Sequence, residues 1–327
     1  MKIGLWSDQS NLFDYENSRD WYTYRWHALR EEFKNRNILL ETFKSRNNLN
    51  EYDIIIENGI QNCIHDKKYL LIIESPHVRP NDWDLRKHLN YKKIFSWDEL
   101  LIDNKKYFKH NLGHFIPKSI PKNFVNKKLC CTIAGNKIAK YPNSDELYSK
   151  RVEFIRWFET NHPSEFDLYG TKWDEFRFGH NKLGRLLNKF KFLRKKDLFP
   201  SYKGTVESKY ETMKNYRFSI SYENIKNTNG YISEKIFDSF IAGCVPIYWG
   251  AKAVTDQIPK GCFIDQREFD NYEDLYKFMK NMDEKIYMKY LDNIEVFFNS
   301  KKSDSFRGET FAKIIVDEIV KDINDNS

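Results

Sequence analysis

The chain has 327 residues and a mass of 39.5 kDa, which at ~150 residues per domain predicts about two domains. Hydrophobic residues make up 40% of the sequence, aromatic residues 16% and charged residues 31%, a composition that excludes a disordered chain. The formal net charge of +7 suits an anionic small molecule or a membrane surface, and it is too small to indicate nucleic acid by itself.

The sequence also bears on location. No apolar run approaches the ~18 residues needed to span a membrane, and the first residues lack the apolar core of a signal peptide. The five cysteines form no CxxC pair, so we expect buried free thiols and neither disulfides nor a zinc site. We therefore expect a cytoplasmic protein with at most a peripheral contact at the inner membrane face.

The first third of the chain alternates short apolar runs with helical spacing. Short runs of β-branched or aromatic residues predict strands at 3–6, 38–43, 52–57 and 69–74. Between the first two, Trp21, Leu29 and Phe33 recur at the spacing of one helix face, which predicts a helix over 21–33. Strand–helix–strand order with nearly continuous apolar strands predicts a parallel sheet covered on both faces.

A proline-punctuated polar stretch at 117–126 predicts a linker to a second α/β domain. Beyond it, apolar runs predict strands at 129–134, 166–169, 218–222, 244–249 and 262–265. Helical spacing predicts helices at 144–159, 233–242, 272–282, 284–298 and 305–323. We thus predict three parts: residues 1–124, residues 125–304, and a C-terminal helix in 305–327 that is free to pack back on the first domain.

Residues 217–237 are the most informative stretch. A buried strand ending at Tyr222 leads into a polar loop, and Ser233 is predicted to cap the next helix, which Gly243 ends. Backbone N–H groups at such a helix start form an anion site, and loops at the carboxyl ends of parallel strands bind ligands. Because Glu234 and Lys235 are adjacent, we expect their side chains to point in different directions. On local residues alone, a solvated helix start is the more common interpretation.

The family resemblance comes from this stretch. Tyr-Glu-Asn at 222–224, Tyr-Ile-Ser-Glu-Lys at 231–235 and Ile-Ala-Gly-Cys-Val-Pro-Ile-Tyr-Trp-Gly at 241–250 closely resemble the signature of the α-1,3-fucosyltransferases. Tyr222 in place of Phe and Ser233 in place of Thr are mild departures. Two weaker matches are Ile73-Glu74-Ser75-Pro76-His77, which resembles the Glu-Ser-Pro box of the acceptor domain, and 148–154, which resembles the helix whose arginine contacts the donor diphosphate. Before Tyr69 nothing aligns.

The resemblance implies an α/β GT-B fold, in which two Rossmann-like domains face each other across a cleft. It assigns acceptor binding to 1–124 and GDP-fucose binding to 125–304. The implied reaction is inverting transfer of fucose from GDP-fucose to the O3 (or O4) hydroxyl of GlcNAc in an oligosaccharide or glycolipid. It implies that no metal or other cofactor is required, with Mn²⁺ or Mg²⁺ at most stimulatory, and that no nucleic acid is a partner.

The resemblance also suggests site residues. Glu74 is the candidate general base, because a carboxylate that ends an apolar strand is partly desolvated, which raises its pKa. Arg151 and Lys235 are assigned to the diphosphate as a forked guanidinium and a point charge. Candidates for further donor contacts are Asn224 and Tyr231 at the phosphates and Glu234 at the ribose. His77 assists the base, contacts the acceptor or only hydrogen-bonds in its loop, and Arg156 competes with Arg151 if the register is off by one turn.

Other features stay open as alternatives. Asp82-Trp83-Asp84 looks like a metal-binding Asp-x-Asp motif, although it falls in a polar loop and not at a strand end. Residues 189–196 interleave cations with aromatics and suit anionic lipid, a glycan phosphate or a solvated face with buried rings. The aromatic residues around 21–26 are interpreted as core and not as a sugar platform. For the whole chain, the rivals are a same-fold transferase with a different nucleotide sugar, a non-catalytic glycan- or lipid-binding relative and, more distantly, a nucleic-acid binder.

Overall fold

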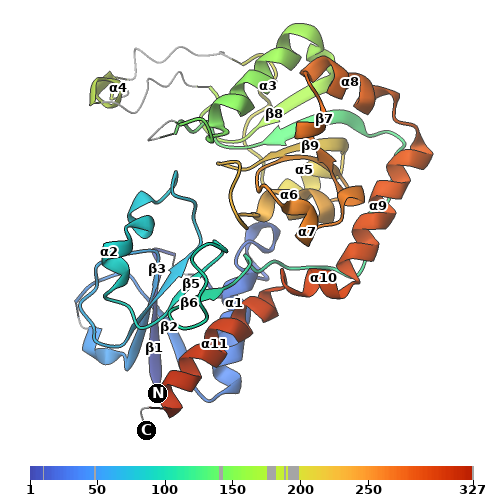
Figure 1. The fold of residues 1–327 in the computed structure, drawn as a ribbon. Coiled ribbons are helices and arrows are strands. Elements are labelled where there is room, and N and C mark those ends of the chain that lie inside the picture. The colour runs from blue at the N-terminus through green and yellow to red at the C-terminus, as the bar shows by residue number, and fades with distance from the viewer. Residues whose placement is uncertain are drawn as a thin grey trace. The chain divides into compact units, whose positions relative to one another are not determined.

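A computed structural model describes residues 1–9, 11–47, 49–139, 143–174, 182–187, 189–190 and 199–325. The chain divides into two compact units (Figure 1). Unit 1 joins Met1–Ile116, Thr228–Ile232 and Ser300–Ser327, and unit 2 joins Pro117–Asn227 and Ser233–Asn299. The first division thus falls at the start of the predicted 117–126 linker, and the C-terminal helix is part of unit 1.

The described part of unit 1 contains a six-stranded parallel sheet in the order β2-β1-β3-β4-β5-β6. Its strands are β1 (Lys2–Trp6), β2 (Leu39–Phe43), β3 (Ile54–Asn58), β4 (Lys68–Ile72), β5 (Ile94–Ser96) and β6 (Tyr107–Lys109). The prediction of a parallel sheet is confirmed. Strands β5 and β6 were not predicted, and β4 ends at Ile72, so Glu74 lies in the following loop and does not end the strand.

Helices cover one face of this sheet. The helices of unit 1 are α1 (Tyr24–Asn35), α2 (Leu85–His88), α10 (Lys301–Asp304) and α11 (Gly308–Asn324). Helices α1 and α11 lie side by side (Figure 1), and their apolar faces share one core with Tyr69 and Leu71 of β4. Leu70 and Ile72 alternate to the opposite face, where they pack with Tyr91 and neighbouring residues. Burying each large apolar side chain contributes about 1.5–3 kcal/mol, so α11 is an integral part of this core.

The described part of unit 2 contains a five-stranded parallel sheet in the order β11-β10-β9-β7-β8. Its strands are β7 (Lys128–Ile133), β8 (Phe166–Tyr169), β9 (Tyr216–Tyr222), β10 (Val245–Trp249) and β11 (Ile264–Asp265). Its helices are α3 (Tyr148–Asn161), α4 (Lys182–Leu187), α5 (Lys209–Met213), α6 (Glu234–Ile241), α7 (Val254–Gln257), α8 (Tyr272–Asn281) and α9 (Glu284–Phe298). The sequence therefore predicts most of these elements within a few residues.

Helix α6 is bounded as the sequence predicts. The Ser233 side chain accepts a hydrogen bond from the Lys235 backbone N–H and caps the helix start. Gly243 follows the helix with φ of +61°, and a Cβ at this position would lie 1.9 Å from the Pro121 carbonyl oxygen. Only glycine fits there. The buried face of α6 packs on α9, with the rings of Phe240 and Phe298 centred 5.9 Å apart.

Two predictions about the chain as a whole can be compared with the structure. All five cysteines are free and buried, as predicted. Among the described residues, no helix combines the length and apolar character that crossing a membrane requires.

Candidate functional site

The carboxyl edge of the unit 2 sheet brings several predicted donor residues together. Since β9 and β10 run parallel, their carboxyl ends lie at the same edge, and the Glu223 backbone N–H donates to the Trp249 carbonyl at 2.8 Å. Arg151 reaches this edge from α3. Its Nη2 donates to the Tyr222 carbonyl at 2.9 Å and to the Glu223 carbonyl at 3.4 Å.

Arg151 is buried, with 4% of its surface exposed, although it is a basic residue on an amphipathic helix. Burial lowers its pKa from the ordinary value, while the charges of Tyr148 and Glu223 oppose that effect. Arg156 on the same helix is half-exposed, pairs with Glu159 at 2.7 Å and lies over the Phe199 ring. The structure therefore brings Arg151, and not its competitor Arg156, to the end of β9.

Glu223 is a functional candidate that the sequence indicates only as part of the Tyr-Glu-Asn motif at 222–224. Its carboxylate is fully buried and accepts hydrogen bonds from Ser233 N at 2.7 Å and Ser233 Oγ at 2.6 Å. It also accepts from Lys235 Nζ at 3.2 Å. A Cβ on Gly250 would lie 2.5 Å from the Glu223 Cγ, so this glycine leaves room for the carboxylate. An acidic residue placed directly after a buried strand was the signal for this role.

Glu223 holds Lys235 at the start of α6. Burial opposes the charge of Lys235, but the carboxylates of Glu223 and Glu234 raise its pKa above the ordinary value. Lys235 Nζ lies 3.8 Å from Glu234 Oε1. The expectation that the Glu234 and Lys235 side chains point in different directions is therefore wrong, because both turn toward the same carboxylate-rich helix start. Asn224 is half-buried beside them, and its carbonyl accepts from Leu147 N at 3.1 Å.

This arrangement of side chains is suited to binding an anion. One guanidinium and one ammonium are fixed by backbone carbonyls and a buried carboxylate, and cations that are fixed in advance need little reorganisation when they meet an anion. Glu234 and Asn224 add oxygen and amide groups that can hydrogen-bond hydroxyls. The cluster of Arg151, Glu223 and Lys235 is called the β9-edge cluster below.

The remaining predicted residues lie in unit 1. Glu74 is half-buried in the loop after β4, and its carbonyl accepts from Trp83 Nε1 at 3.3 Å. Pro76 lies in a tight turn, because Val78 N and Arg79 N both donate to the Ser75 carbonyl at 3.0 Å. His77 is buried in the same turn. Tyr231 belongs to the 228–232 segment, and its ring lies 4.8 Å from that of Trp97. The functional roles of these residues stay predictions.

The Asp82-Trp83-Asp84 motif has its carboxylates engaged. Asp82 accepts from Ile60 N at 2.8 Å and pairs with Arg79 at 3.2 Å, and burial raises its pKa. Asp84 caps α2 and pairs with Arg86 at 2.9 Å. In the part of the chain that is described, no three His, Cys, Asp or Glu side chains group as metal ligands.

The structure bears on two other stretches that the sequence singled out. Tyr22 is 56% exposed whereas Trp26 is buried, so the interpretation of this aromatic stretch as core holds for Trp26 and is wrong for Tyr22. Of the 189–196 cluster, Lys189 and Phe190 are described and exposed, and residues 191–196 lie outside the described residues.

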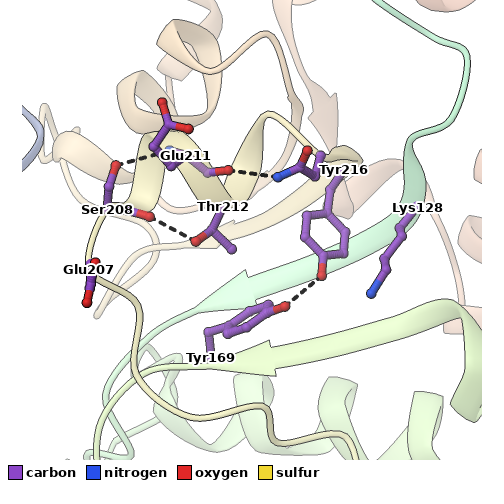
Figure 2. Close-up of a pocket in the computed structure, with 8 residues that line it drawn as sticks. Lys128, Tyr169, Glu207, Ser208, Glu211, Thr212 and Tyr216 are labelled. Atoms are coloured by element: carbon purple, nitrogen blue, oxygen red, sulfur yellow. Dashed lines mark hydrogen bonds between the residues drawn. The ribbon is translucent and has the colours of Figure 1, made fainter.

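A surface hollow of about 510 Å³ is lined by residues of three strands of the unit 2 sheet and by α5 with its flanking residues (Figure 2). Lys128 and Tyr216, which line it, begin β7 and β9, whereas Tyr169, which also lines it, ends β8. The side chains of Lys128 and Tyr216 both have polar partners. The Tyr216 hydroxyl donates to Asp167 at 2.6 Å, and Lys128 forms an ion pair with Asp167 at 2.8 Å. No residue of the β9-edge cluster lines this hollow, so the hollow is separate from that cluster.

Two units that each hold a parallel α/β sheet agree with the GT-B fold of glycosyltransferases, and solved structures of similar fold support this class. The chain is similar to the crystal structure of an α1,3-fucosyltransferase with GDP, with a TM-score of 0.54 and 16% identity over 89% of this chain and 81% of that one. It is also similar to Anabaena Alr3699/HepE in complex with UDP and glucose, with a TM-score of 0.57 and 11% identity over 98% and 100% of the two chains. At sequence identities of 16% and 11%, these similarities show that the folds are alike and nothing more.

The sequence matches the model of glycosyltransferase family 10 (fucosyltransferase), C-terminal part, over residues 136–313, which is more than half of the chain. The chain belongs to this family, and the resemblance stated above is confirmed. It is 31% identical to the α-(1,3)-fucosyltransferase FucT of Helicobacter pylori over 75 residues, and 34% identical to an α-(1,4)-fucosyltransferase of Arabidopsis thaliana over 70. These matches cover 23% and 21% of this chain and only 16% and 17% of the relatives.

Proposed function

We propose that this chain is an inverting, GDP-fucose-dependent glycosyltransferase that transfers fucose to the O3 or O4 hydroxyl of a GlcNAc-containing oligosaccharide or glycolipid. Its membership of family 10 supports fucose as the transferred sugar. The observation that carries the proposal is the β9-edge cluster, where Arg151 and Lys235 are fixed at the carboxyl edge of a parallel sheet. The relatives' names include both α-(1,3) and α-(1,4) linkages, so O3 is our first choice and O4 the second.

In this proposal the β9-edge cluster binds the diphosphate of GDP-fucose. Breaking the bond between fucose and GDP leaves negative charge on the diphosphate, which Arg151 and Lys235 stabilise. Glu223 orients Lys235 and does not itself contact the donor. Asn224 and Tyr231 donate hydrogen bonds to phosphate oxygens, and Glu234 accepts from the ribose hydroxyls.

Glu74 is the proposed general base. Its carboxylate takes the proton from the acceptor hydroxyl while that oxygen attacks the anomeric carbon, the bond to GDP breaks, and the configuration at that carbon inverts. His77 contacts the acceptor or assists this transfer. Because Arg151 and Lys235 supply the positive charge, we propose that no divalent ion is required. Activity should persist in excess EDTA, and a complete loss that Mn²⁺ reverses would instead direct attention to Asp82 and Asp84.

The test is a GDP-release assay with GDP-fucose against N-acetyllactosamine, its type 1 isomer and chitobiose-core glycans, with the product linkage determined by NMR. Glu74→Gln should lower turnover by ~10²-fold or more and leave GDP affinity unchanged, since general-base catalysis contributes on this scale. A normal rate in this variant would reject Glu74 as the base. Preference for another nucleotide sugar in a donor panel would favour a sibling transferase. An absence of any transfer would favour a non-catalytic relative.

A further inference from the structure

Three neighbouring strands of unit 1 end at a common place. Strands β4, β5 and β6 are adjacent and parallel. The buried His110 ties their carboxyl ends together, because its backbone N–H donates to the Ser96 carbonyl at 3.0 Å and its Nε2 lies 3.1 Å from the Ile72 carbonyl. The loops that follow these strands therefore begin side by side.

These loops hold polar atoms that have no partner. Four side chains that form no ion pair with any described residue share this property, at 0%, 8%, 2% and 7% exposure: Ser75 (Oγ), His77 (Nε2), Trp97 (Nε1) and Asn111 (Oδ1). Asp82 Oδ2, in the loop after β4, also lacks a hydrogen bond, but it forms an ion pair with Arg79 at 3.2 Å. None of the four named atoms has a hydrogen-bond partner within the described chain, although Asn111 Nδ2 donates to Ser305 at 3.2 Å. Native proteins leave few buried polar atoms unpaired, and each requires an explanation. Four such atoms in the loops after three adjacent strands indicate a bound group that supplies the missing hydrogen bonds.

The chemistry of these atoms limits what that group is. Trp97 Nε1 can only donate a hydrogen bond and Asn111 Oδ1 can only accept one, whereas Ser75 Oγ and His77 Nε2 can do either. Hydroxyl groups both donate and accept, so a ligand with several hydroxyls satisfies all four. The set contains no lysine, arginine or carboxylate. It therefore suits a neutral sugar better than a phosphate.

Aromatic rings adjoin the same atoms. The Trp83 ring is half-buried and lies 4.9 Å from that of Trp97, and Trp83 Nε1 contacts the carbonyl of Glu74. Aromatic surface with a few convergent polar groups is typical of small-molecule sites. Glu74 is also next to Ser75 in the chain, so the proposed base adjoins this cluster.

We propose that Ser75, His77, Trp97 and Asn111 form the subsite that recognises the hydroxyl groups of the acceptor sugar, directly or through a buried water. This inference rests on the proposed function and deepens it, because it names which side chains bind the neutral pyranose beside Glu74. It also explains why the polar atoms are left without partners inside the protein. They are reserved for the ligand at a cost to stability.

Two conservative variants test the subsite. Ser75→Ala removes one unpaired hydroxyl, and Trp97→Phe removes the indole N–H while keeping an aromatic ring. Each should raise the KM for N-acetyllactosamine about tenfold, as expected for a lost hydrogen bond to the ligand, and leave the Kd for GDP unchanged. Ser75→Ala should not lower the melting temperature, because it removes a buried group that has no partner. As a control, Ser303→Ala removes a buried hydroxyl that donates to the Ser300 carbonyl at 2.9 Å, and it should lower the melting temperature without changing the KM.

Binding of free N-acetyllactosamine, followed by saturation-transfer NMR, separates this inference from the proposed function. Weaker binding in both variants supports the subsite, even if the wild-type protein transfers no sugar and the proposed function fails. Unchanged glycan binding in Ser75→Ala and Trp97→Phe, or no glycan binding by the wild-type protein, would overturn the subsite. A lower melting temperature of Ser75→Ala with an unchanged KM would show that the hydroxyl has only a structural role.

Discussion

Replacing Glu223 by glutamine tests whether its charge holds the start of α6. The substitution keeps the size and shape of the side chain but removes its negative charge. It also replaces one oxygen by an NH₂ group, and a donor beside the Lys235 ammonium repels it. Glu223 accepts from Ser233 N, Ser233 Oγ and Lys235 Nζ, so the variant disturbs both the cap and the lysine.

The size of the effect follows from burial. Removing one partner of a buried ion pair costs about 3–5 kcal/mol. Lys235 keeps 24% of its side chain exposed and retains Glu234 at 3.8 Å, so we expect a loss at or below the bottom of this range, about 2–3 kcal/mol. At about 2–4 °C per kcal/mol, the melting temperature should fall by about 4–12 °C.

The direction in which the stability of the same variant changes with pH can also be predicted. Neighbouring carboxylates raise the pKa of Lys235 above its ordinary 10.5, so the stabilisation is present below pH 10.5 and is lost as the pH rises through the folded-state pKa. In Glu223→Gln this alkaline loss should begin at lower pH. Both effects are measured by thermal melting followed by circular dichroism from pH 7 to pH 11.

The matched control is Glu211→Gln, at an exposed ion pair on the rim of the hollow in Figure 2. Glu211 is 60% exposed, so this variant should melt as the wild-type protein does. Equal melting temperatures for Glu223→Gln and the wild-type protein would refute the reasoning, since they would mean that the buried charge does not secure α6.

Two further predictions concern single residues. Arg151→Lys loses the guanidinium fork that contacts the Tyr222 and Glu223 carbonyls, so the Kd for GDP should rise about tenfold by calorimetry, and an unchanged Kd would move the diphosphate contact elsewhere. Burial lowers the pKa of His110 from 6.5 to about 4, so the unfolded state binds a proton first and stability should fall by about 3 kcal/mol as the pH drops through this interval. Parallel losses of stability in the wild-type protein and His110→Asn between pH 7 and pH 4 would contradict this assignment.

Much of the fold could be predicted from the sequence because its strands are buried on both faces. The apolar run that ends at Tyr222, the cap at Ser233 and the glycine at Gly243 determine the central strand–helix–strand unit through local chemistry. Strands β5 and β6 have three residues each, which is too short for any periodicity to be visible. The strand before Glu74 was predicted two residues too long, because Ile73 continues the apolar run after the hydrogen-bonded ladder has ended.

The candidate site could be predicted only in part. Arg151 and Lys235 were found through a resemblance, and their residue types alone would equally have suited a solvated helix face. The role of Glu223 depends on contacts with Ser233 and Lys235, ten and twelve positions further along the chain. Such contacts form only after the strand, loop and helix have folded together. The four unpaired atoms of unit 1 could not be predicted for the same reason, because the hydrogen-bond partners of a side chain are known only once its packing is known.

The arrangement of unit 1 in separate stretches of chain has a consequence for biosynthesis. Its sheet emerges early from the ribosome, but one face is covered by α11, whose Phe311, Ile315 and Ile319 belong to the core of that face. Until α11 has been translated, only α1 covers the apolar strands on that face, and the uncovered part is exposed to aggregation. Unit 1 is thus begun first and completed after unit 2, and chaperone protection should matter most while unit 2 is being synthesised.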